Sequence, residues 1–112
     1  MKLISIASLL LIVVVATVLV DAERDAEFQT GDGGVKWLPH CDFNGGNFGN
    51  IRVLSGEQCG RACLNNGGCD LFVYKDGVCY LKHHILKILP SYAATSCGSC
   101  DVCGYISRTA YK

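Results

Sequence analysis

The sequence predicts a small α+β domain in which a short helix is held against a β-hairpin by disulfide bonds. Three observations predict it: a helix signal that begins at Ser55, a hairpin signal within residues 71–81, and eight cysteines in 112 residues. In a short chain with a secretion signal, so many cysteines indicate a disulfide framework. Both structural signals, and four of the cysteines, fall in residues 55–82, which we take as the organising segment.

The N-terminal segment has the pattern of a secretion signal. Lys2 precedes an almost wholly apolar run from Leu3 to Val20, and the compact residues that follow predict a signal peptide over residues 1–22. The run is close to the minimum length for crossing a bilayer, so an uncleaved signal anchor is the alternative. Either outcome places the cysteines on the non-cytoplasmic side, where disulfides form.

The segment between the signal and the helix is read as three parts. Residues 23–36 are charged and glycine-rich, which predicts a flexible lead-in outside the core, and the domain is expected to open at residues 37–41. Residues 44–50 read as a tight loop; the alternative of a phosphate cradle lacks the Gly-Lys-Ser/Thr ending that such a loop needs. Residues 51–54 are a brief strand candidate.

The helix is expected to start with a capping box. The Ser55 side chain can cap the first turn, and the Gln58 side chain can reach back to the Ser55 backbone N–H. Glu57 suits the positive end of the helix dipole.

The inner face and the end of the helix are also marked. Cys59, Ala62 and Cys63 recur at the spacing of one helical face. Residues 65–68 read Asn-Asn-Gly-Gly, which predicts a C-terminal cap in the left-handed conformation.

The hairpin follows at once. Residues 71–74 and 78–81 are β-branched and aromatic runs, and Lys75-Asp76-Gly77 between them carries the Asp-Gly signal of a tight turn. Strand alternation directs Phe72 and Tyr74 to one face and Leu71 and Val73 to the other. After the hairpin, residues 82–90 fit a strand, a loop or one helical turn. Residues 91–98 read as a loop, 102–106 as a strand and 107–112 as a C-terminal tail.

Several of these residues together resemble the PAN/apple domain family. The resemblance runs from about Trp37 to Ile106 and rests on Cys41-Asp42-Phe43, on Ser-Gly-Glu-Gln-Cys-Gly at residues 55–60, on Cys63, Gly68-Cys69, Phe72, Tyr74, Gly77 and Cys79-Tyr80-Leu81-Lys82, and on Cys103-Gly104. It implies a small antiparallel sheet wrapped around one helix, in a domain spanning residues 37–106. It also implies extracellular adhesion to a protein or a carbohydrate.

The resemblance also implies three disulfides, whereas the residues alone leave 105 pairings open. The implied pairs are Cys41–Cys103, Cys59–Cys79 and Cys63–Cys69. Cys97 and Cys100 depart from the family pattern, and a fourth bridge between them is the simplest account. Cys97 nevertheless competes with Cys103 as the partner of Cys41.

The segment Cys97-Gly98-Ser99-Cys100 allows enzymatic alternatives. It resembles a papain-like signature, but Asp101 replaces the aromatic residue and the chain downstream is too short to hold the partner histidine. A thioredoxin-like redox pair needs a βαβ context, which is not evident. Cys97, Cys100 and Cys103 with His83 or His84 suggest a zinc site, although bridged cysteines are favoured in an oxidising compartment. A plain disulfide is the prediction, with a redox protein as the remote alternative.

The charge and the motifs point away from catalysis and nucleic acid. Ten basic and ten acidic side chains give a formal net charge of zero, with no basic stripe for binding phosphates. We find no pattern for nucleophilic, metal or carboxylate-pair catalysis. We therefore expect a binding module without cofactor or metal, and with no membrane contact once the signal is removed.

Binding is expected to depend on aromatic side chains, because flat rings stack on sugars and anchor protein interfaces. The candidates are Trp37, Tyr74, Tyr80, Tyr92 and Tyr105. The predicted function is a secreted, non-catalytic module for an extracellular protein or glycan. A small secreted effector or protease-inhibitor-like protein is the alternative.

Overall fold

The computed structural model describes residues 27–85 and 88–107. The predicted signal peptide, the start of the lead-in at 23–26 and the tail at 108–112 lie outside these residues. The elements, in chain order, are β1 (Gln29–Thr30), the 3-10 turn η1 (Asp32–Gly34), β2 (Val35–Pro39), β3 (Cys41–Asp42), β4 (Asn47–Arg52), α2 (Gly56–Leu64), β5 (Leu71–Lys75), β6 (Val78–Lys82), α3 (Pro90–Ala93), β7 (Thr95–Ser96) and β8 (Val102–Ile106).

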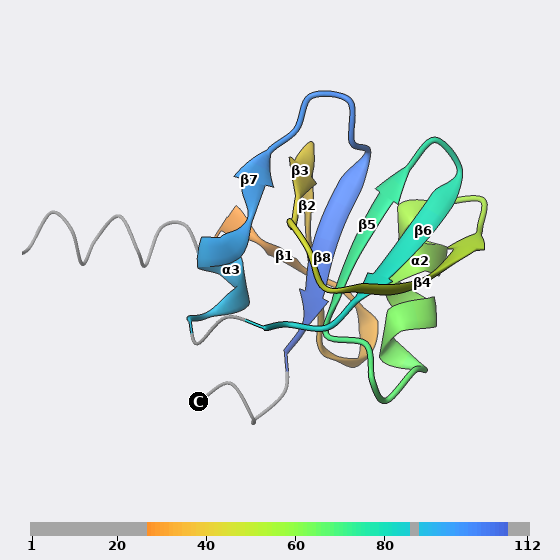
Figure 1. The fold of residues 1–112 in the computed structure, drawn as a ribbon, viewed down its shortest axis with the longest axis horizontal. Coiled ribbons are helices and arrows are strands. Elements are labelled where there is room, and N and C mark those ends of the chain that lie inside the picture. The colour runs from red at the N-terminus through yellow and green to blue at the C-terminus, as the bar shows by residue number, and fades with distance from the viewer. Residues whose placement is uncertain (1–26, 86–87, 108–112) are drawn as a thin grey trace, which may run out of the picture.

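Six of the strands form one antiparallel sheet in the order β1-β2-β8-β5-β6-β4, and β3 and β7 form a separate two-stranded sheet (Figure 1). The last strand, β8, therefore lies in the middle, between β2 and β5. This arrangement confirms the predicted α+β class, an antiparallel sheet packed on one main helix.

The hairpin is formed as its turn sequence predicts. Strands β5 and β6 pair antiparallel, with Lys75 opposite Val78. The two residues between them, Asp76 and Gly77, have φ angles of +51° and +77°. Positive φ at both central residues is the geometry that the Asp-Gly sequence favours in a tight hairpin turn.

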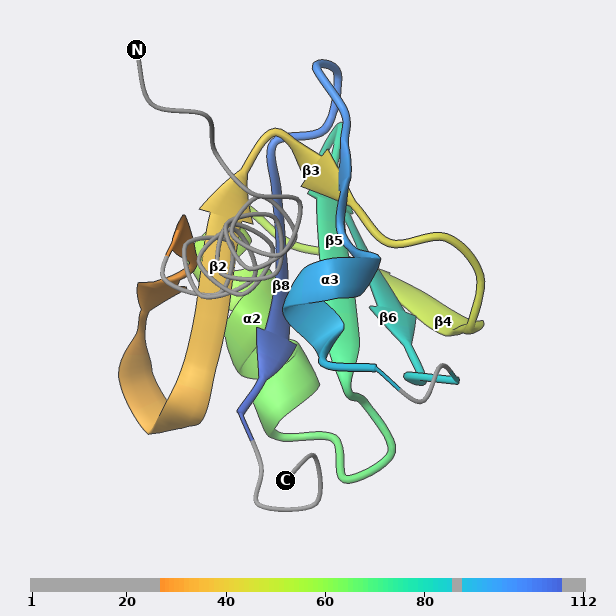
Figure 2. The same cartoon turned by 90° about the vertical axis from the view of Figure 1, so that its left-hand side faces the viewer.

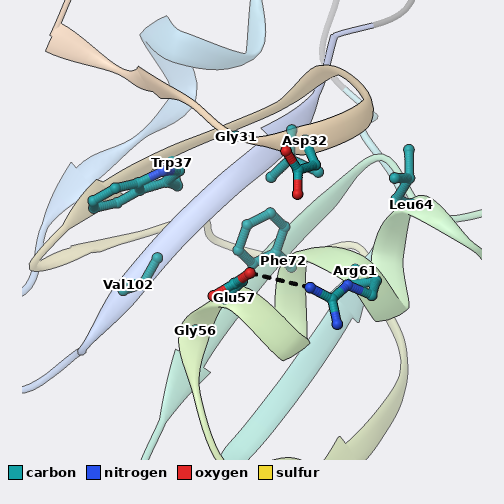
Figure 3. Close-up of a pocket in the computed structure, with 10 residues that line it drawn as sticks. Gly31, Asp32, Trp37, Gly56, Glu57, Arg61, Leu64, Phe72 and Val102 are labelled. Atoms are coloured by element: carbon teal, nitrogen blue, oxygen red, sulfur yellow. Dashed lines mark hydrogen bonds and ion pairs between the residues drawn. The ribbon is translucent and has the colours of Figure 1, made fainter.

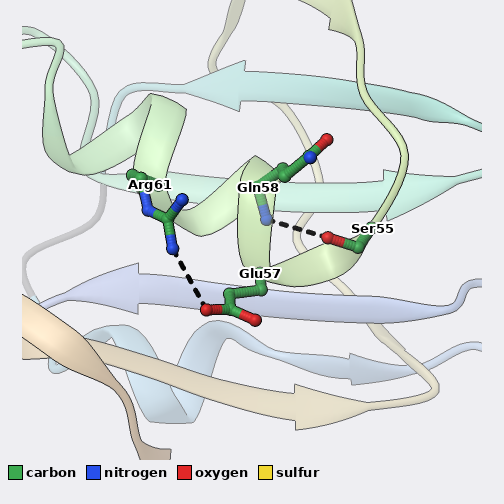
Figure 4. A network of polar contacts seen from close by, with 4 residues as sticks. All are labelled: Ser55, Glu57, Gln58 and Arg61. Atoms are coloured by element: carbon green, nitrogen blue, oxygen red, sulfur yellow. Dashed lines mark hydrogen bonds and ion pairs between the residues drawn. The ribbon is translucent and has the colours of Figure 1, made fainter.

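Helix α2 begins where its cap predicts, with the Ser55 side chain at its first turn (Figure 4), although a second contact differs. The Gln58 backbone N–H donates to Ser55 Oγ at 3.2 Å. The Gln58 side chain accepts from the backbone N–H of Leu54 at 2.8 Å, so the expected bond to the Ser55 N–H is wrong by one residue. The extended backbone of Ser55 allows the preceding N–H to reach the side chain.

Two further details of α2 differ from the sequence prediction. Its buried residues are Cys59, Gly60 and Cys63, whereas Ala62, which was predicted to share the face of the two cysteines, is only half-buried. A Cβ on Gly60 would lie 3.1 Å from Phe72 Cζ, so the glycine allows the helix to approach the sheet closely. The helix ends at Asn65 in the right-handed conformation, so the predicted left-handed cap is wrong.

Alternate residues of β5 enter two separate clusters, as strand periodicity predicts. Phe72 belongs to the α2-side cluster, and Leu71 and Val73 belong to the α3-side cluster. The α2-side cluster consists of Val35, Cys59, Cys63, Cys69, Phe72, Cys79 and Ile106. The α3-side cluster consists of Phe28, Cys41, Phe43, Leu71, Val73, Ala94, Cys100, Cys103 and Tyr105. Figure 2 shows the sheet between α2 on one side and α3 on the other.

Residues that the sequence assigns to loops take part in the fold. Phe28 is buried against Tyr105, with ring centroids 5.2 Å apart, and residues 35–36 pair with β8. The prediction of a lead-in outside the core is therefore wrong from Phe28 onward. Strand β4 starts at Asn47, inside the predicted loop, and α3 and β7 replace the loop expected at residues 91–98. β4 overlaps the predicted strand at residues 51–54 and pairs with β6, and α3 starts at a proline, which suits the first turn of a helix.

Four disulfides cross-link the fold, two of them between distant parts of the chain and two within short segments. Cys59–Cys79 ties α2 to β6, and Cys63–Cys69 ties the end of α2 to the segment before β5. On the other face, Cys41–Cys103 ties β3 to β8, and Cys97–Cys100 closes the loop before β8. The pairs are those that the family resemblance implies, together with the extra bridge.

The α3 side also buries a lysine. The ammonium of Lys82 donates to the backbone carbonyl of Phe43 at 2.5 Å and to that of Gly45 at 3.4 Å. Only 6% of the residue is exposed. Burial lowers the pKa of Lys82, and the nearby Asp42 carboxylate partly opposes this by favouring the charged form. The buried cation thus satisfies carbonyls of the irregular segment between β3 and β4.

Candidate functional site: a cleft beside helix α2

A cleft of about 400 Å³ lies where η1, β2, β8 and α2 meet (Figure 3). Its volume is within the range of about 300–1,000 Å³ typical of ligand pockets. The residues that line it are Gly31, Asp32, Val35, Trp37, Gly56, Glu57, Arg61, Leu64, Phe72 and Val102.

Glycines shape the η1 wall of the cleft. Gly33 has φ of +68°, and a Cβ on it would lie 2.5 Å from Leu64 Cδ2. Only glycine combines this backbone conformation with such close approach to the helix. The Gly31-Asp32-Gly33-Gly34 sequence therefore brings Asp32 to the edge of the cleft, opposite the side chains of α2 (Figure 3).

The floor comes from the sheet. Trp37 of β2 lies opposite Gly104 of β8, and Phe72 comes from the next strand, β5. A Cβ on Gly104 would collide with the Phe72 ring, so the ring lies over the bare backbone of β8. Val102, two residues earlier in β8, lines the same floor.

The helix wall combines one apolar and two charged side chains. Glu57, Arg61 and Leu64 are spaced at i, i+4 and i+7, which places them on one face of α2. Arg61 donates to Glu57 at 3.1 Å, and the two side chains are 58% and 77% exposed. A pair this exposed contributes little to stability, about 0.3–0.5 kcal/mol. Its charges are accessible to a ligand at the rim.

The structure brings only one of the five predicted aromatic residues into the cleft, namely Trp37. Tyr74 packs against the α2-side cluster and donates its hydroxyl to the Val53 carbonyl at 3.1 Å. Tyr80 packs against the opposite cluster, and Tyr92 lies in α3. Tyr105 is buried, with 7% of its surface exposed, so it is a core residue and its choice as a binding residue is wrong.

The residues considered for zinc or redox chemistry have structural partners. Cys97, Cys100 and Cys103 are all in disulfides, which leaves no thiolate in this group to ligate zinc. His84 contacts the Ile88 carbonyl through Nε2 at 2.6 Å. Within residues 27–85 and 88–107, no group of three or more potential ligands is placed to hold a metal ion. The Cys97–Cys100 bridge lies in the loop between β7 and β8, away from the helix start that a thioredoxin-like pair requires.

Sequence reasoning did not assign a binding role to the other cleft residues. Asp32 falls in the predicted lead-in, and Phe72 enters the prediction as a strand residue and as part of the family resemblance, without a binding role. The Gly-Asp-Gly-Gly run was the one available signal, because consecutive glycines mark a turn that needs positive φ. The cleft itself joins segments separated by up to about seventy residues, which no local pattern records.

The fold and the cleft define a small disulfide-bonded α+β domain of the kind that presents a binding surface. The family model described as "PAN domain" matches residues 37–105, which is more than half of the chain. The chain therefore belongs to the PAN domain family, whose members are generally protein- or carbohydrate-binding modules without catalytic activity. Searches of curated proteins and of solved structures found no match. Neither helix among the described residues has the length and apolarity needed to span a membrane.

Proposed function

We propose that this protein is a secreted, non-catalytic binding module that holds an extracellular protein or glycan in the cleft beside α2. The observation that carries the proposal is the cleft itself, with its apolar floor and accessible charged rim. Family membership supports a binding role. The four disulfides and the predicted signal peptide at residues 1–22 support an extracellular location.

Filling the cleft tests this proposal. Gly31 has an extended backbone, with φ of −106°, and a Cβ added there lies 3.7 Å from Trp37 Cδ1, which is an ordinary contact. Gly31→Val therefore adds bulk inside the cleft without backbone strain. Gly67→Val is the matched control, because Gly67 has open space around its Cβ and does not line the cleft.

The disulfide-intact protein is applied in solution to a glycan array. In immobilised form it is used for a pull-down from extracellular fluid. We expect enrichment of a glycan or a protein that falls at least tenfold with Gly31→Val and is unchanged by Gly67→Val. Circular dichroism checks that both variants keep the fold. No enrichment in either assay would overturn the binding function. Enrichment that Gly31→Val leaves intact would overturn the assignment of the cleft.

A further inference from the structure

The interior of the cleft matches an apolar side chain better than a sugar. The side chains that form its floor and walls are Val35, Trp37, Leu64, Phe72 and Val102. A sugar ring placed among them would bury hydroxyl groups with few partners, and each buried polar group without a hydrogen bond costs free energy. An apolar side chain instead gains about 25 cal/mol for each Å² that it removes from water.

The size of the cleft limits what enters it. At about 30 Å³ per water molecule, a volume of about 400 Å³ corresponds to roughly a dozen waters. This is room for one large side chain and part of its neighbour, but not for a folded element. The occupant therefore enters as one large side chain with part of its neighbour, which a short, extended piece of chain is sufficient to supply.

The charges at the rim favour a cation. Asp32 stands on η1, across the cleft from Glu57 and Arg61 on α2 (Figure 3). Glu57 and Arg61 form the one ion pair found in the described part of the chain, so Asp32 remains a carboxylate without a cationic partner there. Two carboxylates against one guanidinium leave an excess negative charge beside an apolar interior.

We infer that the cleft binds an extended segment of a partner protein that carries a large apolar side chain next to a lysine or arginine. The apolar side chain lies against Trp37 and Phe72, and the neighbouring cation faces Asp32. This inference rests on the proposed function and narrows it, because it selects a protein segment over a glycan as the ligand.

The protein carries its own reporter for this test. Trp37 is the single tryptophan of the chain and it lines the cleft, so its fluorescence reports on occupancy. Three blocked tetrapeptides are titrated to 10 mM into the disulfide-intact protein: Gly-Leu-Lys-Gly, Gly-Ala-Lys-Gly and Gly-Leu-Glu-Gly. Isothermal calorimetry on the same samples checks that a change in emission is binding.

We expect the leucine–lysine peptide to bind best and the alanine peptide to bind about tenfold more weakly, because it loses most of the apolar contact. The glutamate peptide is expected to bind about threefold more weakly at low salt, with the difference disappearing near 1 M salt, where surface charges are screened. Asp32→Asn should bring the ratio of the lysine and glutamate peptides close to one. Asp76→Asn, which removes the same charge from the hairpin turn outside the cleft, should leave the ratio unchanged.

The outcomes separate the inference from the function beneath it. No response to any peptide up to 10 mM, equal binding of the alanine peptide, or preference for glutamate would each overturn the inference. If a glycan is bound and Gly31→Val blocks it while the peptides give no response, the proposed function stands and the inference fails. If neither glycan nor protein is enriched, the proposed function itself fails.

Discussion

The two faces of the sheet bury clusters of similar chemistry, but they are covered by different kinds of chain. One face lies under α2, a regular helix with an N-terminal cap and a buried glycine against Phe72. The other lies under the short elements β3, α3 and β7 and the segments between them. On the α2 side, residues of α2, η1 and the neighbouring strands frame the cleft. The irregular cover instead needs a buried ammonium to satisfy its carbonyls.

The disulfides are divided between these faces, and their removal has the largest expected effect. By loop entropy the four bridges together contribute on the order of 10 kcal/mol, which is comparable with the total stability of about 5–15 kcal/mol of a typical domain. We expect full reduction to abolish cooperative thermal unfolding, measured by circular dichroism with and without reductant. A reduced protein that kept its native spectrum and melting temperature would contradict this.

Paired Cys→Ala variants then compare the faces. The separation is 62 residues for Cys41–Cys103, 20 for Cys59–Cys79 and 3 for Cys97–Cys100. Loop entropy predicts that the free energy of unfolding falls by about 4, 3 and 2 kcal/mol, in that order. Urea unfolding measures these losses. The Cys97–Cys100 variant is the control for removing two sulfurs with little loop closure. A reversed order would mean that native packing, and not loop length, determines the contribution of each bridge.

Adjacent residues of β5 compare the packing of the two faces directly. Phe72 and Val73 are 1% and 3% exposed and lie in opposite clusters. Phe72→Ala is expected to lower the free energy of unfolding by about 3–5 kcal/mol, because it opens a cavity between α2 and the sheet. Val73→Ala removes a smaller group from the α3 side and is expected to cost about 2 kcal/mol. Equal losses in urea unfolding would contradict the larger cavity expected from Phe72→Ala.

The smallest expected effect is the contribution of the buried Lys82 to the pH dependence of stability. It concerns the α3 side alone. Because burial lowers the pKa of Lys82, the unfolded state binds more protons than the folded state between the folded pKa and the ordinary value of 10.5. Stability from this group therefore rises with pH across that window and is constant below it. Relative to Lys82→Met, the wild-type protein should gain stability as the pH rises toward 10.5.

Urea midpoints for both proteins, from neutral pH to 10.5, measure this difference. Lys75→Met is the matched control, since Lys75 lies at the end of β5, beside the hairpin turn, and is only half-buried. A stability difference between the wild type and Lys82→Met that fell with pH would show that the folded state favours the charged lysine.

The α2 side was largely predictable from sequence, whereas the α3 side was not. The Ser55 cap, the i, i+4 spacing of Cys59 and Cys63, and the Asp76-Gly77 turn each depend on residues a few positions apart. Local sequence patterns therefore record them. Phe28 and Pro90 are buried only because distant strands place a surface beside them. The cleft shares this property. Trp37 was singled out for its chemistry, but Asp32 and Arg61 gain a role only when η1 and α2 are brought together.

The central position of β8 has a consequence for biosynthesis. Among the strands of the described residues β8 is synthesised last, and it inserts between β2 and β5, which are made earlier. Until then, two inner strand edges stay open, and Cys41 has no Cys103 to pair with. Pairing of such long range is slow, and open strand edges favour aggregation. Until β8 pairs with both neighbours, the sheet is therefore incomplete and its inner edges are open to other chains.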